Sequence, residues 1–338
     1  MRVGVIGCGT VATKGHIPAF RKLGLNVVGV ADSSKVALRR ISAKRKYTDY
    51  KKLLDQNLEI VSICAPPFLH HEMCLEAAER GINILVEKPL ALTVEEGRDI
   101  KKAVEENAVK LSVVHNYKYL DPLIKAKRMQ ETGQLGRLLS VNTFVHSHNP
   151  YQTKGWRMNE KKAGSMISQW NHPLYINTWF AGKPKSVFAI GKKVVIPDYP
   201  SLADIRVLID FDESTGYIEM SEFCSCPGIS FNLVGTGASL SIKPPNFKVL
   251  APSLGLEAVE DMLSSVKNVG RVFRMYLDMR FQSHKGYTWG SHFALIKDFV
   301  ESLKSNGKVP ADVDEGILSI RIATAIDDSI RIGNKITI

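Results

Sequence analysis

Long apolar runs are missing from the sequence, and we expect neither a membrane-spanning segment nor a secretory leader. None of its apolar runs reaches about 18 residues, the length that a helix needs to cross a bilayer. Met1 and Arg2 lead straight into the apolar stretch 3–6, without the longer apolar core and small-residue cleavage site of a signal peptide. We therefore expect a cytoplasmic protein that has no membrane partner.

Cysteine is scarce and irregularly placed. Of the five cysteines, Cys8, Cys64 and Cys74 lie inside apolar segments, where cysteine behaves as a small hydrophobic residue. Cys224 and Cys226 form a close pair that could be redox-active, but no other metal-ligand spacing accompanies them. The pattern favours a reducing compartment and predicts neither a metal site nor a disulfide framework.

A concentrated patch of basic charge is also missing. The net charge of +11 is spread over the chain, with +6 over residues 1–120 and +5 over the rest, and the one local basic cluster lies within residues 39–46. Proteins that bind nucleic acid concentrate this charge and interleave it with aromatic residues. We expect a solvated surface and no nucleic-acid partner, with attraction of an anionic cofactor or substrate as the alternative.

The first third of the chain alternates short apolar runs with helical patterns. A capping box, Thr93 to Glu96, opens one of the helices, 93–107, and another is predicted over 70–80. Strands separated by helices at this spacing form right-handed βαβ units around a buried parallel sheet. Residues 1–120 are therefore predicted to be a doubly wound Rossmann domain with strands at 3–6, 26–31, 60–65, 83–87 and 111–114.

The pattern changes after residue 120. Helices are predicted from Pro122 to near Gly133 and over 164–180, and a long alternating strand over 137–148. Residues 121–338 are thus predicted to be an α+β domain with a large, open, mostly antiparallel sheet flanked by helices. Its other strands are expected, as consecutive antiparallel neighbours, at 185–195, 203–211, 215–224, 229–235 and 238–242, and its other helices at 256–280, 292–303 and 314–332.

A glycine-rich turn follows the first strand and opens a helix, in the order Gly7-Cys8-Gly9-Thr10-Val11-Ala12. In such motifs Gly7 permits the tight turn, Gly9 lets the backbone approach a pyrophosphate, and a small third residue, Ala12, allows close packing of helix on strand. The N–H groups at the start of the helix, at Thr10 and Val11, then face the phosphates. The motif predicts a dinucleotide cofactor.

Asp32 ends the second strand, at the spacing expected of a carboxylate that binds the adenosine ribose hydroxyls. Because a carboxylate repels a 2′-phosphate, Asp32 favours NAD over NADP. Ser33 and the neighbouring Ser34, Lys35 and Arg39 could instead hold that phosphate, so NADP stays open.

Further motifs resemble the Gfo/Idh/MocA family of oxidoreductases. Residues 65–70 resemble its Thr-Pro-Asn-x-x-His loop, residues 87–90 its Glu-Lys-Pro signature, and residues 116–119 the stretch that ends its fifth strand. The resemblance covers residues 1–180 well and 287–338 more loosely. It implies that the cofactor is also bound by Ala65, Pro66, His70, Glu87, Lys88 and Asn116.

The resemblance also implies a catalytic role for Lys88, whose counterpart in the family contacts the reacting oxygen beside the nicotinamide. An ammonium group can polarise that oxygen and stabilise the charge that develops on it. The peptide bond before Pro89 is expected to be cis on the same grounds.

A second family signature is altered in this sequence. The family places a histidine four residues after an aspartate; here His172 keeps its place, but Ser168 stands in the aspartate position. Because residues four apart on a helix share a face, we expect these two side chains to be able to meet one ligand. We expect His172 to be catalytic, and the substrate to be bound by Lys88, Trp156, Arg157, Ser168 and His172.

The expected function is hydride transfer between a nicotinamide cofactor and a sugar, polyol or sugar acid, with Lys88 polarising the oxygen and His172 exchanging the proton. The alternatives are an NAD-assisted glycosidase and a dinucleotide-binding sensor without catalysis. We also expect a homodimer or homotetramer, since too few helices follow residue 180 to cover both faces of an open sheet.

Overall fold

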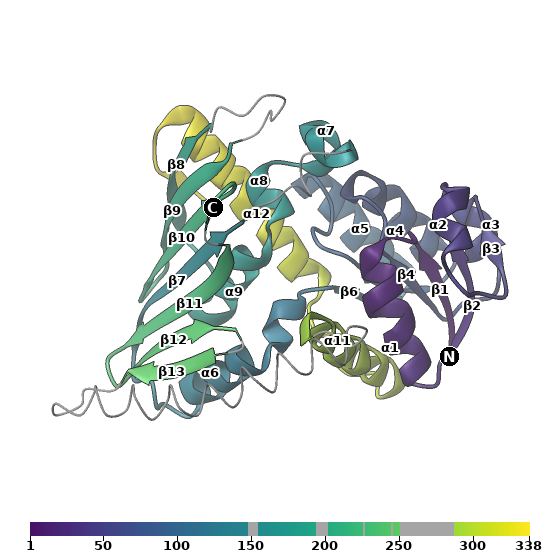
Figure 1. Cartoon of the computed structure of the whole chain (residues 1–338), viewed down its shortest axis with the longest axis horizontal. Helices are drawn as coiled ribbons and strands as arrows, with labels where there is room; N and C mark the ends of the chain where they lie inside the picture. Colours follow the sequence, from purple (N-terminus) through teal and green to yellow (C-terminus); the bar gives the residue numbers. More distant parts are fainter. Residues whose placement is uncertain (148–154, 194–201, 226, 245, 251–286) are drawn as a thin grey trace.

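The structure is a computed structural model that describes residues 1–147, 155–193, 202–225, 227–244, 246–250 and 287–338. Two sheets lie at opposite ends of the molecule, with helices of both parts between them (Figure 1). Within the described part, no helix is both long and apolar enough to cross a bilayer. The helix expected over 256–280 and Cys226 lie outside the described residues.

The first sheet is parallel throughout and has the strand order β3-β2-β1-β4-β5-β6. Its strands agree with the sequence prediction to within two residues, with one further short strand, β3. They are β1 Arg2–Ile6, β2 Asn26–Ala31, β3 Lys46–Tyr47, β4 Ile60–Ile63, β5 Asn83–Val86 and β6 Leu111–Val113.

Helices cover both faces of this sheet, as a doubly wound fold requires. The predicted capping box is present, because Thr93 accepts a hydrogen bond from the Glu96 backbone and the Glu96 side chain reaches back. One face carries α3, α4 and α5, and the other α1 and α2. The bounds are α1 Ile17–Lys22, α2 Lys35–Arg39, α3 Tyr50–Leu54, α4 His70–Glu79 and α5 Val94–Glu106.

The second sheet has eight strands in the order β13-β12-β11-β7-β10-β9-β8-β14. The expectation of consecutive antiparallel neighbours is wrong at one place: the first strand, β7, lies between β10 and β11 and runs parallel to β10. The strands are β7 Leu138–His146, β8 Ser186–Lys192, β9 Asp204–Asp210, β10 Thr215–Ser221, β11 Gly228–Gly235, β12 Ser239–Lys243, β13 Asn246–Leu250 and β14 Ile336–Thr337.

The helices that the structure describes pack on one face of this sheet (Figure 1). Alternate residues of its strands are buried against α6 Asp121–Glu131, α9 His172–Ala181 and α12 Val313–Ile332. The opposite face (the open face) keeps large apolar side chains exposed, including Ile190 at 51% and Leu208 at 57%.

The helix expected over 164–180 is interrupted. Helix α8 Met166–Gln169 is capped at its C-terminal end by Trp170, and α9 begins at His172 with a proline in its first turn. Proline has no backbone N–H and fixes its own φ, so it begins helices more readily than it continues them. Ser168 and His172 therefore stand on different helices, and the expectation that they share a helical face is wrong.

The last two helices join the two parts of the chain. Helix α11 Tyr287–Lys304 packs on α1 and adds Leu295, Ile296 and Phe299 to the core of the parallel sheet. Helix α12 contributes Ile320 to the core on the other face of that sheet and Ile326 to the core of the second sheet. The sequence boundary at residue 120 separates the two sheets, but not the helices that cover them.

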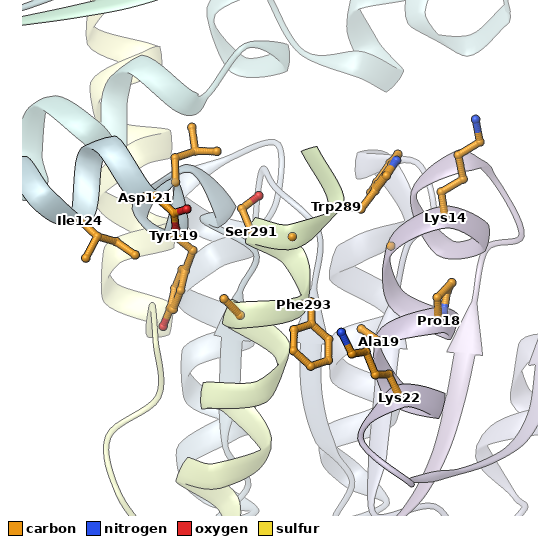
Figure 2. A pocket seen from close by; sticks show the side chains of 14 residues that line it. Lys14, Pro18, Ala19, Lys22, Tyr119, Asp121, Ile124, Trp289, Ser291 and Phe293 are labelled. Atoms are coloured by element: carbon orange, nitrogen blue, oxygen red, sulfur yellow. The ribbon is translucent and has the colours of Figure 1, made fainter. Parts of the chain in front are cut away.

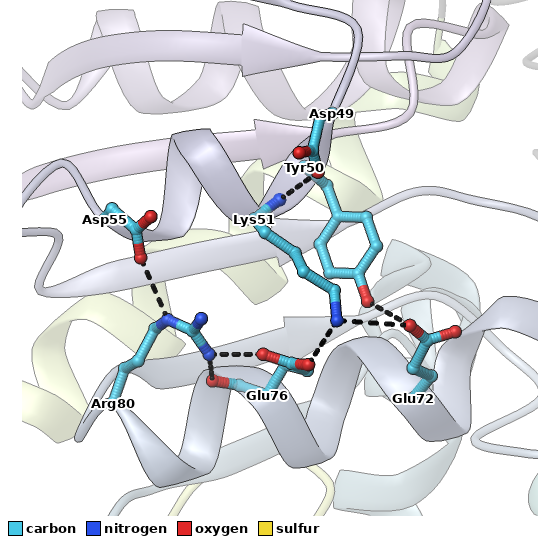
Figure 3. A network of polar contacts seen from close by, with 7 residues as sticks. All are labelled: Asp49, Tyr50, Lys51, Asp55, Glu72, Glu76 and Arg80. Atoms are coloured by element: carbon cyan, nitrogen blue, oxygen red, sulfur yellow. Dashed lines mark hydrogen bonds and ion pairs between the residues drawn. The ribbon is translucent and has the colours of Figure 1, made fainter.

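An ion-pair network on the surface connects α3 with α4 (Figure 3). Lys51 contacts Glu76 at 2.6 Å and Glu72 at 3.8 Å, and Tyr50 donates to Glu72 at 2.7 Å. Arg80 completes the network with ion pairs to Glu76 and Asp55. Since exposed pairs of this kind each contribute about 0–1 kcal/mol, the network orients the helices more than it stabilises them.

Candidate active site

A groove of about 600 Å³ crosses the carboxyl ends of β1 and β4 and extends toward the second sheet. Ligands of open α/β sheets bind at this edge. Most of the predicted cofactor residues line it: Gly7, Gly9, Thr10, Val11, Asp32, Ala65, Pro66, Glu87 and Lys88.

The two glycines of the motif have different roles. Gly7 has φ +88°, and a Cβ there would lie 2.5 Å from the Cys64 carbonyl oxygen, so the fold itself requires glycine. A Cβ on Gly9 would meet no protein atom within 4 Å. Its lack of a side chain therefore leaves open space in the groove wall, as the approach of a pyrophosphate needs.

Asp32 is held by the backbone at the end of β2. Its two carboxylate oxygens accept the N–H groups of Cys8, at 2.7 Å, and of Ser34, at 2.8 Å. These bonds fix the carboxylate beside the glycine turn and leave each oxygen a further lone pair for a ribose hydroxyl. Ser33 is exposed next to it and does not line the groove.

Behind the groove, Glu87 contacts two histidines, and we call His16, Glu87 and His292 the Glu87 cluster. Glu87 lies 3.0 Å from Nε2 of His16 and 3.7 Å from Nε2 of His292. Although burial opposes ionisation, the histidines hold the pKa of Glu87 at about 2, and Cys64 and Glu87 raise that of His16 to about 10. A buried ion pair results. In the described part of the chain this is also the one group of three close enough to hold a metal ion.

Lys88 follows Glu87 and points toward the helices of the second sheet. Its Nζ donates to the carbonyl oxygen of Gln169 at 2.9 Å, and the peptide bond to Pro89 is cis, as expected. Burial lowers the pKa of Lys88, with the charge of Arg157 acting in the same direction and that of Glu87 against it. The amine form is therefore more accessible than in an ordinary lysine.

His70 supports the groove without lining it. The side chain is fully buried, with Nδ1 2.8 Å from the Pro89 carbonyl oxygen and Nε2 2.9 Å from that of Ala65. Since both partners are carbonyl oxygens, the N–H of the ring donates to one of them, and the ring lies between the 65–70 loop and the loop that carries Lys88. Asn116 is likewise buried outside the groove lining, where its amide donates to Ser291 at 3.2 Å.

The far wall of the groove comes from the second part of the chain. Trp156 and Arg157, both predicted, line it, and the guanidinium of Arg157 lies 4.2 Å from the Trp156 ring centroid. Gln169 and Trp170 line it as well and were not predicted. Gln169 is the last residue of α8 and Trp170 follows it in the break before α9, a break that the sequence pattern did not indicate.

His172 begins α9 beside this wall, with 8% of its surface exposed. The ring stacks on Tyr117 with centroids 3.8 Å apart, and Nδ1 lies 2.6 Å from the hydroxyl oxygen of Tyr175. Burial lowers the pKa of His172 well below 6.5, and the charge of Lys88 adds to this. His172 is therefore neutral at physiological pH.

Ser168 contacts the residues that precede α8, Gly164 and Ser165. Its hydroxyl lies 3.3 Å from that of Ser165, and a Cβ on Gly164 would meet its Cβ at 2.9 Å. A different acidic residue lies nearby, because Glu222 accepts the indole N–H of Trp170 at 3.0 Å. Burial raises the pKa of Glu222 to about 7. Nothing in the local sequence around Glu222 marks it as a site residue.

A second cavity, of about 620 Å³, lies between α1, α6 and α11 (Figure 2). Lys22 reaches across it to the ring of Phe293, with Nζ 4.5 Å from the centroid, and Trp289 closes the side next to Gly15. None of the predicted cofactor or substrate residues lines it.

The residues present in the groove fit a nicotinamide dinucleotide. Gly9 leaves space for the pyrophosphate, the backbone fixes the Asp32 carboxylate for a ribose, and Lys88 lies at the other end beside the second wall. This order along one groove is that of a Rossmann cofactor site with a substrate site at its nicotinamide end.

Comparisons with known proteins agree with this geometry. A family model described as "Oxidoreductase family, NAD-binding Rossmann fold" matches residues 1–115, and one described as "GFO/IDH/MocA C-terminal domain" matches residues 123–241. An uncharacterized oxidoreductase of Rhizobium meliloti is 37% identical over 72% of this chain and 75% of its own.

Two characterised proteins are more distant. The scyllo-inositol 2-dehydrogenase (NADP(+)) of Bacillus subtilis is 24% identical over 97% of this chain and 93% of its own. The WlbA dehydrogenase of Bordetella pertussis, solved with NADH and UDP-GlcNAcA, has a TM-score of 0.84 at 21% identity and covers 100% of this chain and 97% of its own. The last match shows the fold alone.

Proposed function

Because the chain belongs to the GFO/IDH/MocA family of oxidoreductases, we propose that it transfers a hydride between a nicotinamide cofactor and a CH–OH group of a sugar, polyol or sugar acid. The names of the relatives support this substrate class, since they include an inositol dehydrogenase and a levoglucosan dehydrogenase. They give no support to the glycosidase or the sensor.

The observation that carries the proposal is the position of Lys88. It lines the same groove as the glycine turn and Asp32, and its Nζ contacts Gln169 in the opposite wall. When bound, the cofactor supplies the hydride chemistry. We propose that Lys88 and His172 act on the reacting oxygen, and that Trp156 and Arg157 bind the rest of the substrate.

The remaining predicted residues have supporting roles in this proposal. Glu87, His70 and Asn116 hold the loops that carry the groove, and Ser168 shapes the turn before α9. The activity is tested with a panel of sugars, polyols and sugar acids by following the absorbance of reduced cofactor. Net reduction during turnover is expected; release of a free sugar without net reduction would identify the glycosidase instead.

We expect NADH to bind more tightly than NADPH, because Asp32 would accept ribose hydroxyls and repel a 2′-phosphate. Asp32→Ser should reduce this preference by roughly ten- to a hundredfold, the scale of a hydrogen bond to a charged group. Titration by cofactor fluorescence measures both affinities, and Asp55→Ser, outside the groove, serves as the control. Tighter binding of NADPH by the wild-type chain would show that Ser33 and its neighbours outweigh Asp32.

We further propose that the chain is a cytoplasmic homo-oligomer, a dimer or tetramer, assembled through the open face of the second sheet. Exposed apolar side chains such as Ile190 and Leu208 support this, because covering them removes apolar surface from water. Leu208→Glu should shift the mass measured by light scattering toward the 37.5 kDa monomer. Val36→Glu, an equally exposed site on α2, is the matched control. A wild-type monomer at micromolar concentration contradicts the proposal.

A further inference from the structure

The hydroxyl of Tyr175 makes two hydrogen bonds whose directions can be assigned. The backbone N–H of Tyr117 lies 3.1 Å from Oη, and Nδ1 of His172 lies 2.6 Å from it. A backbone N–H can only donate, so Oη accepts the first bond. The single phenol proton is then left for the second bond, in which Tyr175 donates and Nδ1 of His172 accepts.

The surroundings of Tyr175 exclude the opposite arrangement. Its side chain is 1% exposed, the His115 ring stacks on it with centroids 4.1 Å apart, and no other described residue offers its proton an acceptor. If Nδ1 of His172 carried the proton, the phenol proton would be buried without a partner. An unsatisfied buried donor disfavours that state on the order of ten- to a hundredfold.

We propose that Tyr175 is a positioning residue that fixes His172 in the neutral tautomer with its proton on Nε2. Nε2 is the nitrogen that remains for the substrate, since Nδ1 is occupied and Nε2 bonds no described residue. The proposal rests on the proposed function, in which His172 acts on the reacting oxygen.

With this tautomer, Lys88 and His172 have different roles at the reacting oxygen. An Nε2–H group donates a hydrogen bond to that oxygen but has no lone pair to accept its proton. In the oxidation direction the O–H bond of the substrate breaks and its proton passes to the lone pair of the Lys88 amine. A bound oxidised nicotinamide would take up the hydride of the same carbon as its C=O bond forms. Lys88 is therefore the base and His172 the donor, the reverse of the roles expected from the sequence.

The tautomer is measured directly by ¹⁵N NMR on protein labelled at its histidines, at neutral pH, with and without NADH. The His172 signals are assigned by their loss in His172→Gln. We expect the Nε2–H pattern in the wild-type chain, and a mixture of tautomers in Tyr175→Phe. Tyr117→Phe is the matched control: it also loses a phenol hydroxyl from a ring stacked in the site, but not one that bonds His172, and should keep the wild-type pattern. An Nδ1–H or imidazolium pattern in the wild-type chain would overturn the proposal.

Kinetics tests the consequence separately. His172→Gln places an amide N–H near the position of Nε2 but cannot exchange a proton. Turnover should therefore stay within about tenfold of wild type, whereas His172→Leu should lose on the order of 10²–10³, the scale of one lost donor to a developing oxyanion. If glutamine is as inactive as leucine, His172 exchanges the proton and the donor role is wrong. If neither variant loses activity, the proposed function of His172 fails, whatever tautomer the spectrum shows.

Discussion

Lys88→Ala should lower turnover by at least about a thousandfold while the affinity for NADH stays within about threefold. The lysine is proposed to act on the reacting oxygen, so its loss should fall on the transition state and not on cofactor binding. General acid–base catalysis alone accounts for about 10²–10⁴ in rate. Steady-state kinetics and cofactor titration measure the two effects.

The pH profile of the wild-type enzyme tests the same residue. Because burial and Arg157 lower the pKa of Lys88, its amine form should appear at lower pH than in an ordinary lysine. The rate of substrate oxidation should therefore rise with pH, with an apparent pKa below the ordinary lysine value of about 10.4. Lys102→Ala, an exposed lysine on α5, is the control. Turnover of Lys88→Ala within tenfold of wild type would remove Lys88 from the chemistry.

Glu87→Gln should destabilise the fold by about 3–5 kcal/mol, because it leaves the buried His16 without its anionic partner. For a chain of this length the melting temperature should fall by roughly 4–7 °C. The pKa of Glu87 is depressed, so its contribution to the stability of the fold is present above its unfolded pKa and is lost as the pH falls toward about 2. The pKa of His16 is raised, so its contribution to stability is present below its unfolded pKa and is lost as the pH rises through about 10. The difference between wild type and variant should thus be largest between about pH 4.5 and 6.5.

The control for this measurement is Glu76→Gln in the surface network of Figure 3. That glutamate contacts Lys51 and Arg80, but the pairs are exposed, and its loss should cost less than about 1 kcal/mol. Equal destabilisation by the two substitutions would show that the Glu87 cluster does not act as a buried ion pair.

Much of the cofactor half could be predicted because its determinants are local in sequence. The turn at Gly7 and the end of β2 at Asp32 each follow a buried strand, and parallel strands bring their carboxyl ends to one edge. The order of the second sheet could not be predicted in the same way. Strand β7 pairs with β10, which begins 69 residues beyond its last residue, His146, and no short-range pattern encodes that pairing.

The substrate half shows the limit of helical periodicity. The spacing from Ser168 to His172 indicated one face of one helix, but Pro173 lies in the first turn of a new helix, so the two residues stand on different helices. Glu222 reaches Trp170 from the end of β10, a contact that depends on tertiary packing. Tyr175 could have been noticed three residues after His172, but the direction of its hydrogen bond depends on the Tyr117 backbone, far away in the chain.

Helix α12 has a consequence for the synthesis of the chain. Its 20 residues span roughly 30 Å, and they complete hydrophobic cores beneath both sheets. Helix α11 adds a third contribution, to the core against α1. Domains generally fold in order as they leave the ribosome. Here the dinucleotide-binding unit is encoded first, but its apolar surface is fully covered only once α11 and α12 have emerged, so neither half completes its core before these two helices are synthesised.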